Sequence, residues 1–212
     1  MLTLAVPTLN RFDLLQLCVS SALAGTVRPD QVLVIDNSSG QCPEIAGAEI
    51  VPGRQPQSVA KAWNDAVRLV AGDLILSNDD IAFAPDTIAC LLTIASEHPR
   101  AGIVSAIAGE RFALFWLRYA AYLDMGGFDE GYSPTYFEDN HAARVLSLKG
   151  WEMPIAPCAV GHVRSATLAA YTAAQMAEHH EAFRRNRARY YDVWGGLPGE
   201  EVYTEPYGAR HA

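Results

Sequence analysis

The sequence predicts an α/β fold in which a mostly parallel central sheet is flanked by helices. Three observations lead to this prediction. Short apolar runs alternate with amphipathic runs of helix length through the first half of the chain, which is typical of consecutive strand–helix units. Polar residues follow each apolar run directly, as they do at the carboxyl ends of parallel strands. A chain of 212 residues that is 50% hydrophobic and 19% charged can bury one sizeable core.

The elements of the first half follow from periodicity, length and end signals. Apolar runs of strand length are separated by longer amphipathic runs, and Pro85 suits the first turn of a helix. The predicted elements are strands over residues 2–6, 32–35, 74–76 and 102–108, and helices over residues 13–24, 58–70 and 85–97.

The second half is less regular, and its predicted elements are fewer. Gly150 ends a helix that begins near Glu138, since glycine favours the position after a helix. The predictions are a strand over residues 111–118, a helix over 138–149, an extended segment over 155–163, a long helix over 167–190 and a loop or arm from Gly195. We expect residues 1–166 to form one core, on which the C-terminal helix and tail of residues 167–212 pack.

Charge and cysteine usage restrict the class of protein. The 16 basic and 24 acidic residues give a net charge of −8, which disfavours nonspecific binding to nucleic acid. The four cysteines form no CxxC pair, so we expect reduced and mostly buried thiols. No apolar run approaches the roughly 18 residues that a membrane span requires. We therefore expect a cytoplasmic protein without a transmembrane segment.

The most informative segment is a buried strand that ends in an amide and two carboxylates, Asn78-Asp79-Asp80. Adjacent like charges at a strand end are costly unless a cation or a hydrogen-bond network shares them. One interpretation is a metal site. An equally weighted one, on this segment alone, is an Asx turn or a cap for the next helix.

Four other motifs, taken together with this segment in their order along the chain, favour the metal site. The five are Val6 to Arg11, Val34 to Ser39, Asn78 to Asp80, Gly126 to Glu130 followed by Phe137-Glu138-Asp139 and Arg144, and Gly161-His162. In this order the sequence resembles the GT-A glycosyltransferases of family 2, from Leu2 to about Ser165. The resemblance implies a single GT-A (Rossmann-like) domain, in which residues 1–110 bind the nucleotide sugar and residues 111–166 face the acceptor. Ser58 and Ala66 stand where glycines are common in the family, and His141 stands where a second acidic residue often follows.

The resemblance implies a metal-dependent donor site. Asp80, in the place of the DxD-like motif, and His162 would be ligands of Mn²⁺ or Mg²⁺, which stabilises the charge of a departing pyrophosphate. Without the motif order, His162 is more often a hydrogen-bonded structural histidine. Asp36 and Thr8 would hold the base and ribose, although both positions also suit turn chemistry. The residues expected to bind the donor are Pro7, Thr8, Asn10, Arg11, Asp36, Asn37, Asn64, Asn78 and Asp79.

The acceptor side requires a group that takes the proton of the attacking hydroxyl. Asp139 is the candidate base, and Glu138 is expected to orient the acceptor or cap the helix. Both residues also suit the first turn of a helix, where acidic side chains favour the macrodipole. One base and no carboxylate nucleophile imply a single displacement with inversion at the anomeric carbon, as family 2 membership also implies.

The predicted function is transfer of a hexose or related sugar from a nucleotide diphosphate, UDP being the family's common nucleotide, to a hydroxyl acceptor such as a glycan, lipid or protein. A hydroxylated base in DNA is a second option because Phe183 to Tyr191, with Trp194, form a basic segment interleaved with aromatics. This segment could bind a pyrophosphate, an anionic polymer or a lipid phosphate, and Tyr190, Tyr191 and Trp194 would offer stacking faces to sugars or bases. That segment is more often a solvated helix face, and we expect His179 and His180 nearby to be surface residues. Further alternatives are a sugar-phosphate nucleotidyltransferase and a noncatalytic sugar-nucleotide binding module.

Overall fold

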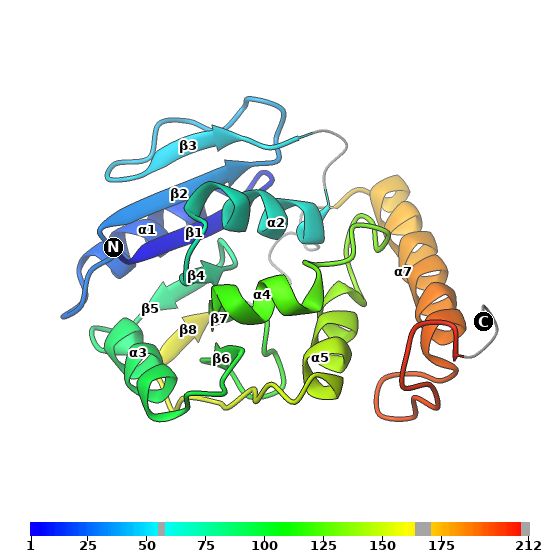
Figure 1. Cartoon of the computed structure of the whole chain (residues 1–212). Helices are drawn as coiled ribbons and strands as arrows, with labels where there is room; N and C mark the ends of the chain where they lie inside the picture. Colours follow the sequence, from blue (N-terminus) through cyan, green and yellow to red (C-terminus); the bar gives the residue numbers. More distant parts are fainter. Residues whose placement is uncertain (55–57, 164–170, 209–212) are drawn as a thin grey trace.

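The computed structural model describes residues 1–54, 58–163 and 171–208, and its centre is a six-stranded sheet with the strand order β3-β2-β1-β4-β7-β6 (Figure 1). The strands are β1 (Thr3–Thr8), β2 (Gln31–Asp36), β3 (Glu49–Pro52), β4 (Leu74–Ser77), β6 (Ile103–Ser105) and β7 (Leu114–Leu117). Strands β1 to β4 are parallel, whereas β7 runs antiparallel to both of its neighbours. The predicted mixed α/β fold with a mostly parallel sheet is confirmed.

Helices lie on both faces of this sheet, and a small second sheet lies beside it. The helices are α1 (Phe12–Leu23), α2 (Val59–Val70), α3 (Thr87–Glu97), α4 (Tyr119–Met125), α5 (Glu138–Leu148) and α7 (Ala173–Trp194). The second sheet pairs β5 (Ile81–Phe83) with β8 (Val160–His162) in antiparallel register. This second sheet fixes the segment that follows β4, which is the segment that carries the acidic pair.

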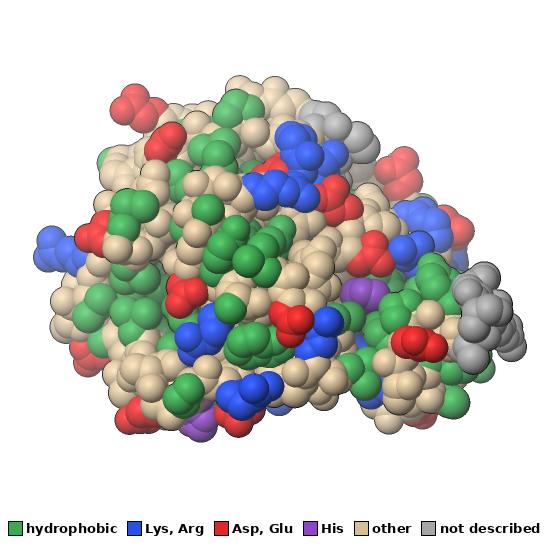
Figure 2. Space-filling view, in the orientation of Figure 1, with side chains coloured by type: hydrophobic (Ala, Val, Ile, Leu, Met, Phe, Trp, Pro, Cys, Tyr) green, Lys and Arg blue, Asp and Glu red, His purple; other side chains and the backbone are tan. Residues whose placement is uncertain are grey.

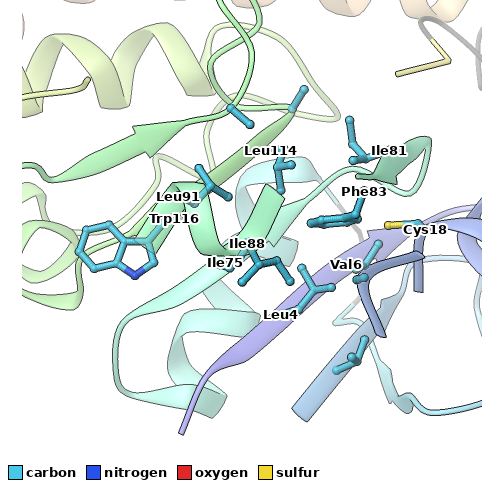
Figure 3. Close-up of a cluster of buried hydrophobic side chains, with 14 of the residues drawn as sticks. Leu4, Val6, Cys18, Ile75, Ile81, Phe83, Ile88, Leu91, Leu114 and Trp116 are labelled. Carbon is cyan, nitrogen blue, oxygen red and sulfur yellow. The ribbon is translucent and has the colours of Figure 1, made fainter. Parts of the chain in front are cut away.

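The alternation of side chains along the strands divides the core into two layers. In β1, Leu4 and Val6 pack with α1 and α3 on one face, and Ala5 packs with α2, α4 and α5 on the other. Figure 3 shows the first layer, in which Leu4 and Val6 gather with residues such as Ile75 from β4. Since both faces of these strands are buried, they read as continuous apolar runs.

Several elements differ from the sequence expectations. Sequence analysis did not identify β3, β5 or α4, which are short and lack a long periodic pattern. Only part of each extended segment over 102–108, 111–118 and 155–163 pairs as a strand. Helix α3 begins at Thr87 and not at Pro85, because the Thr87 hydroxyl accepts a hydrogen bond from the Ala84 amide in a preceding turn. Of the four free cysteines only Cys18 is buried, so the expectation of mostly buried thiols was wrong.

Helix α7 begins and ends later than the predicted helix over 167–190, the first residues of which lie outside the described part of the chain. Thr172 and Gln175 form a capping box at its start. Its C-terminal half packs on the segment before α5 through an aromatic cluster of Tyr132, Phe137, Tyr190, Val193 and Trp194. The tail folds back, as the amide of Tyr203 donates to the Trp194 carbonyl over 3.0 Å.

Candidate active site

The acidic pair lies at the carboxyl end of β4, next to the end of β1. Strand β4 is fully buried, and the turn after it places the partly buried Asp79 and Asp80 at the sheet edge. Thr8, the last residue of β1, donates a hydrogen bond of 2.7 Å from its hydroxyl to Asp79 Oδ2. Burial raises the pKa of Asp79 to about 6, and the neighbouring charge of Asp80 acts in the same direction. The predicted donor residues Thr8 and Asp79 are therefore brought together.

His162 faces Asp80 because the β5–β8 pairing places it there. Ile81 is opposite His162 in the register, and the Val163 amide donates to the Asp80 carbonyl over 3.0 Å. Nε2 of His162 lies 3.2 Å from Oδ1 of Asp80, and both side chains are only about one-eighth exposed, at 13% and 12%. Burial raises the pKa of Asp80, and the His162 charge opposes that shift. The two predicted metal ligands thus meet at one point.

Glu110 completes this arrangement and was not found from the sequence. Its Oε2 lies 2.7 Å from Nδ1 of His162, which fixes the orientation of the imidazole and leaves Nε2 directed at Asp80. A carboxylate behind a histidine is the usual support of a metal-binding imidazole. Glu110 lies in a turn between strands, where no local pattern distinguishes it from a surface residue.

The residues around Asp80 fit a divalent cation with two protein ligands. Oδ1 of Asp80 is buried, and its contact with Nε2 of His162 at 3.2 Å is not a hydrogen bond of good geometry. Its separation from Nε2 of His162 matches the roughly 3 Å expected between adjacent octahedral ligands that each lie about 2.1 Å from a metal. The described residues contain no group of three or more His, Cys, Asp or Glu side chains able to hold a metal. The remaining coordination positions would therefore belong to substrate oxygens or water.

The loops after β1 and β2 bring together most of the remaining residues predicted to bind the donor. The Asp36 carboxylate accepts hydrogen bonds from the Ser38 amide at 2.7 Å, the Gly40 amide at 3.0 Å and the Ser38 hydroxyl. The Asn37 amide donates to the Thr8 carbonyl, which joins the two loops. Asp36 therefore shapes its own loop in an Asx turn and is itself buried, at 3% exposure.

Arg11 and Pro7 lie on the β1 side of this edge. The Arg11 guanidinium pairs with Asp13 at 3.0 Å, and this contact raises the Arg11 pKa. Pro7 lies within β1 opposite Ile35, and the amide of Asn78 donates to the Ala113 carbonyl beside β4. These residues occupy the predicted edge, and the contacts of their main chains give it a fixed shape.

A cavity of about 590 Å³ opens between the β1 and β2 loops and helix α7. Asn10 and Asn37 line it on the loop side, and the buried Oδ1 of Asn37 accepts no hydrogen bond from the described residues. The remaining lining residues are Leu9, Ser38, Ser39, Gln41, Pro134, Tyr171, Gln175, Glu178, His179, Ala182 and Arg185. This volume is large enough to hold a nucleotide-sized ligand.

Asn64 lies apart from these loops and holds the glycine-containing loop before α5. Its Nδ2 donates to the Phe128 carbonyl and to Glu130, each at 2.9 Å. Its Oδ1 accepts from the Phe128 amide and the Tyr122 hydroxyl. Gly127 has a φ of +86°, and a Cβ there would lie 3.2 Å from this Oδ1. All four hydrogen-bonding positions of the Asn64 amide are thus used inside the protein.

Glu138 and Asp139 begin helix α5 in different surroundings. Glu138 is 4% exposed, its Oε1 lies 3.4 Å from the Thr135 hydroxyl, and its Oε2 has no hydrogen-bond partner among the described residues. Asp139 is partly exposed, and its Oδ1 accepts from the amide and side chain of Asn140, each at 2.8 Å. Burial raises the pKa of both carboxyls. Asp139 is therefore the carboxylate of the pair that a substrate can reach.

The protonation of Glu138 predicts a pH-dependent stability. Burial and the charge of Asp139 raise its folded-state pKa to about 8, from an ordinary value of 4.5. Between these values the folded protein keeps a proton that the unfolded chain releases, so the free energy of unfolding falls as pH rises, by up to about 1.4 kcal/mol per pH unit. Urea unfolding of Glu138→Gln should match wild type near pH 4 and exceed it in stability at pH 8.

The control for this measurement is Glu97→Gln, which changes an exposed glutamate at the end of α3. Its stability should follow that of the wild type at every pH. A Glu138→Gln variant with the same difference from wild type at pH 4 and pH 8 would contradict the raised pKa of Glu138.

The basic and aromatic segment of α7 mainly docks the helix on the rest of the protein. Tyr190 and Trp194 are fully buried, so the idea that they present stacking faces to a ligand was wrong. Trp194 Nε1 donates to Nδ1 of His141 over 3.2 Å, and Arg189 pairs with Asp129 at 2.9 Å. His179 was expected at the surface but is 9% exposed and lies 2.9 Å from the Tyr136 hydroxyl. The sequence of a long amphipathic helix does not indicate which of its faces packs on the rest of the protein.

Parallel strands that deliver polar residues to one edge, with antiparallel β7 beside β4, correspond to the GT-A class of glycosyltransferase folds. Residues 3–144 match the family model described as glycosyl transferase family 2. Because this match covers more than half of the 212 residues, the chain belongs to glycosyl transferase family 2, and the expected glycosyltransferase family is confirmed.

The fold is also similar to that of a solved structure from Pyrobaculum calidifontis. This is the mannosyltransferase PcManGT in complex with GDP-Man and Mn²⁺, with a TM-score of 0.67 and 18% sequence identity. The alignment covers 93% of this chain and 66% of that chain, so this chain spans just under two thirds of its length. No curated protein matches the sequence significantly. At 18% identity the likeness concerns the fold.

Proposed function

We propose that this protein catalyses metal-dependent transfer of a hexose or related sugar from a nucleotide diphosphate donor to a hydroxyl acceptor, with inversion at the anomeric carbon. The observation that carries the proposal is the junction of β1, β4 and β8. There Thr8 binds Asp79, while Asp80 and His162 face each other 3.2 Å apart. Membership of glycosyl transferase family 2 supports the reaction class.

Asp80 and His162 would hold Mn²⁺ or Mg²⁺, and Glu110 would orient His162. When bound, the cation supplies positive charge next to the diphosphate that leaves. A site with one carboxylate and one imidazole suits Mn²⁺ better than Mg²⁺, because Mg²⁺ strongly prefers oxygen ligands. Asp79 keeps the β1 loop against β4 through Thr8, so the two loops that meet the donor keep a fixed spacing.

The donor would lie along the edge formed by the β1 and β2 loops. Asn10 and Asn37 line the cavity there and offer amide groups to a base or ribose. Asp36 would act mainly through the loop that it shapes, since three donors already bind its carboxylate. Asn64 would act at a distance by fixing the loop around Phe128. UDP is the nucleotide that the family resemblance favours.

Asp139 would take the proton from the attacking hydroxyl, and Glu138 would position it. Asn140 holds Asp139 by two hydrogen bonds, which leaves the second carboxylate oxygen to accept a proton. The raised pKa of Asp139 makes it a stronger base than an exposed aspartate. A single base without a carboxylate nucleophile corresponds to one displacement, and therefore to inversion.

A glycan, lipid or protein hydroxyl is the acceptor class that we propose. The observation that favoured DNA was the arginine and aromatic segment. In it Arg189, Tyr190 and Trp194 dock α7 on the rest of the protein, and Arg184 is paired with Glu181 within the helix. On the face shown in Figure 2, basic and acidic side chains lie next to one another. Arg54 and Arg68 both pair with Asp65. Of the helices described, none combines the length and apolar character that crossing a membrane requires. We propose a cytoplasmic location.

The test is a thermal-shift panel of nucleoside diphosphates and their sugars, each with and without Mn²⁺. A ligand at 100 times its Kd adds about 2.7 kcal/mol to the free energy of unfolding. At about 2 to 4 °C per kcal/mol, the midpoint should rise by roughly 5 to 10 °C with the matching base and metal together. If no nucleotide raises the midpoint with or without Mn²⁺, the proposed donor site is wrong.

A further inference from the structure

One face of α7 forms a wall of the cavity opposite the β1 and β2 loops. Gln175, Glu178, Ala182 and Arg185 all line the cavity, and their spacing of three or four residues places them on one side of the helix. Figure 1 shows α7 on the side of the molecule toward which β2 and β3 point. The match to the family model ends at residue 144, so this wall lies outside the matched segment.

Arg185 differs in its partners from Arg184 and Arg189. Arg184 pairs with Glu181 at 2.6 Å, and Arg189 pairs with Asp129 at 2.9 Å, so carboxylates neutralise both. Among the described residues Arg185 binds no carboxylate, and its one hydrogen bond runs from a terminal NH2 to the Ser133 carbonyl over 2.5 Å. That bond fixes the direction of the guanidinium while its other N–H donors remain available. Arg185 thus brings a positive charge to the cavity, at the opposite end of the α7 wall from Gln175 and Glu178.

The opposite wall provides polar groups without a positive charge. Asn37 presents a buried Oδ1 that accepts no hydrogen bond from the described residues, and Ser38 and Ser39 lie beside it. The two walls together suit a ligand with hydrogen-bonding edges at one end and negative charge at the other. At about 1.5 Å per residue, Gln175 and Arg185 are roughly 15 Å apart along the helix, which suits an elongated ligand. A nucleoside diphosphate has these properties.

We propose that α7 completes the nucleotide pocket and that Arg185 binds the phosphate groups of the donor. This inference rests on the proposed function and adds to it a binding residue from the C-terminal helix. A planar guanidinium held by one backbone contact can still offer two parallel N–H groups to phosphate oxygens. The base and ribose then face Asn37 and the first turns of α7, among them Gln175 and Glu178.

Calorimetric titration in the presence of Mn²⁺ tests the inference without an acceptor. The probes are the nucleoside diphosphate selected by the thermal-shift panel and the nucleoside with the same base. Loss of one charged hydrogen-bond donor is worth about tenfold or more in affinity. Arg185→Gln should therefore weaken diphosphate binding at least tenfold and change nucleoside binding less than twofold. Arg185→Lys, which keeps the charge but not the fork, should give an intermediate loss for the diphosphate.

Arg184→Gln is the matched control, because it removes the same charge one residue away from an arginine already paired with Glu181. It should bind both probes as wild type does. Equal loss of nucleoside and diphosphate affinity in Arg185→Gln would mean that the wall has only moved, and unchanged diphosphate affinity would mean that Arg185 makes no contact. Either result overturns this inference alone, whereas a wild-type protein that binds no nucleotide overturns the proposed function as well.

Discussion

Asp80→Asn is expected to abolish metal-linked nucleotide binding while leaving the unliganded protein at least as stable as wild type. The Asp80 carboxylate is largely buried, its Oδ1 lacks a hydrogen bond of good geometry from the described residues, and burial raises its pKa. Such a charge is costly to keep in a fold unless a cation shares it. Removing this charge should therefore not lower the stability of the protein without metal, but it should prevent the metal-linked binding of nucleotide.

The measurement compares thermal midpoints with and without Mn²⁺ and the matching nucleoside diphosphate. Wild type should gain roughly 5 to 10 °C at 100 times Kd, and Asp80→Asn less than about 1 °C. Asp192→Asn makes the same chemical change at an exposed position in the last turn of α7 and should retain the full gain. If Asp80→Asn kept the metal-dependent shift, Asp80 would not be a ligand and the proposed site would lie elsewhere.

The sheet was predictable from the sequence because its parallel strands are buried on both faces. Residues 2–6, 32–35 and 74–76 read as unbroken apolar runs, and each corresponds to a strand whose length was predicted to within a few residues. The short elements were not predictable in this way. Strand β5 has three residues, and its pairing partner β8 lies about 80 residues away in the chain. Its existence depends on tertiary contacts that no local periodicity records.

The candidate site was predictable where it depends on strand ends and failed where it depends on distant packing. Asp80 and His162 were named from the order of motifs, and the structure brings them together across the β5–β8 pair. Glu110 was missed, because no local pattern links a loop glutamate to a distant histidine. The basic segment of α7 was considered for binding a pyrophosphate, but nothing local showed that one face of this helix lines a cavity. The same reason explains why Tyr190 and Trp194 were read as exposed.

The contacts of Asn64 and Asp36 inside the protein differ from the donor binding that we expected for them. Asp36 lies at the end of β2, whereas Asn64 lies apart from the β1 and β2 loops. Asn64 forms its hydrogen bonds with the loop around Phe128, and Asp36 accepts three hydrogen bonds from its own turn. Polar side chains that follow strands can serve backbone geometry as well as ligands. In this protein some polar residues that we expected to bind the donor therefore hold the loops of the site in place.

Asp139→Asn is expected to lower turnover by roughly 10²- to 10⁴-fold, the usual contribution of a general base. An amide at this position can still accept the two hydrogen bonds from Asn140, so the local structure should persist. Donor binding should change less than twofold, because the proposed donor contacts lie on the β1 and β2 loops. Turnover is measured as release of the nucleoside diphosphate, and binding is measured by calorimetry on the same samples.

The pH dependence of the reaction separates a base from a positioning residue at Asp139. A base must be ionised, so the rate of the wild type should fall as pH drops through the pKa of Asp139, which burial raises above the ordinary value of aspartate. This fall of the rate at low pH should be absent in Asp139→Asn. Asp124→Asn, which alters an exposed aspartate on α4, should keep both the rate of the wild type and its fall at low pH. Turnover of Asp139→Asn within threefold of wild type would instead leave Asp139 as a first-turn residue that favours the dipole of α5, and the proton would need another acceptor.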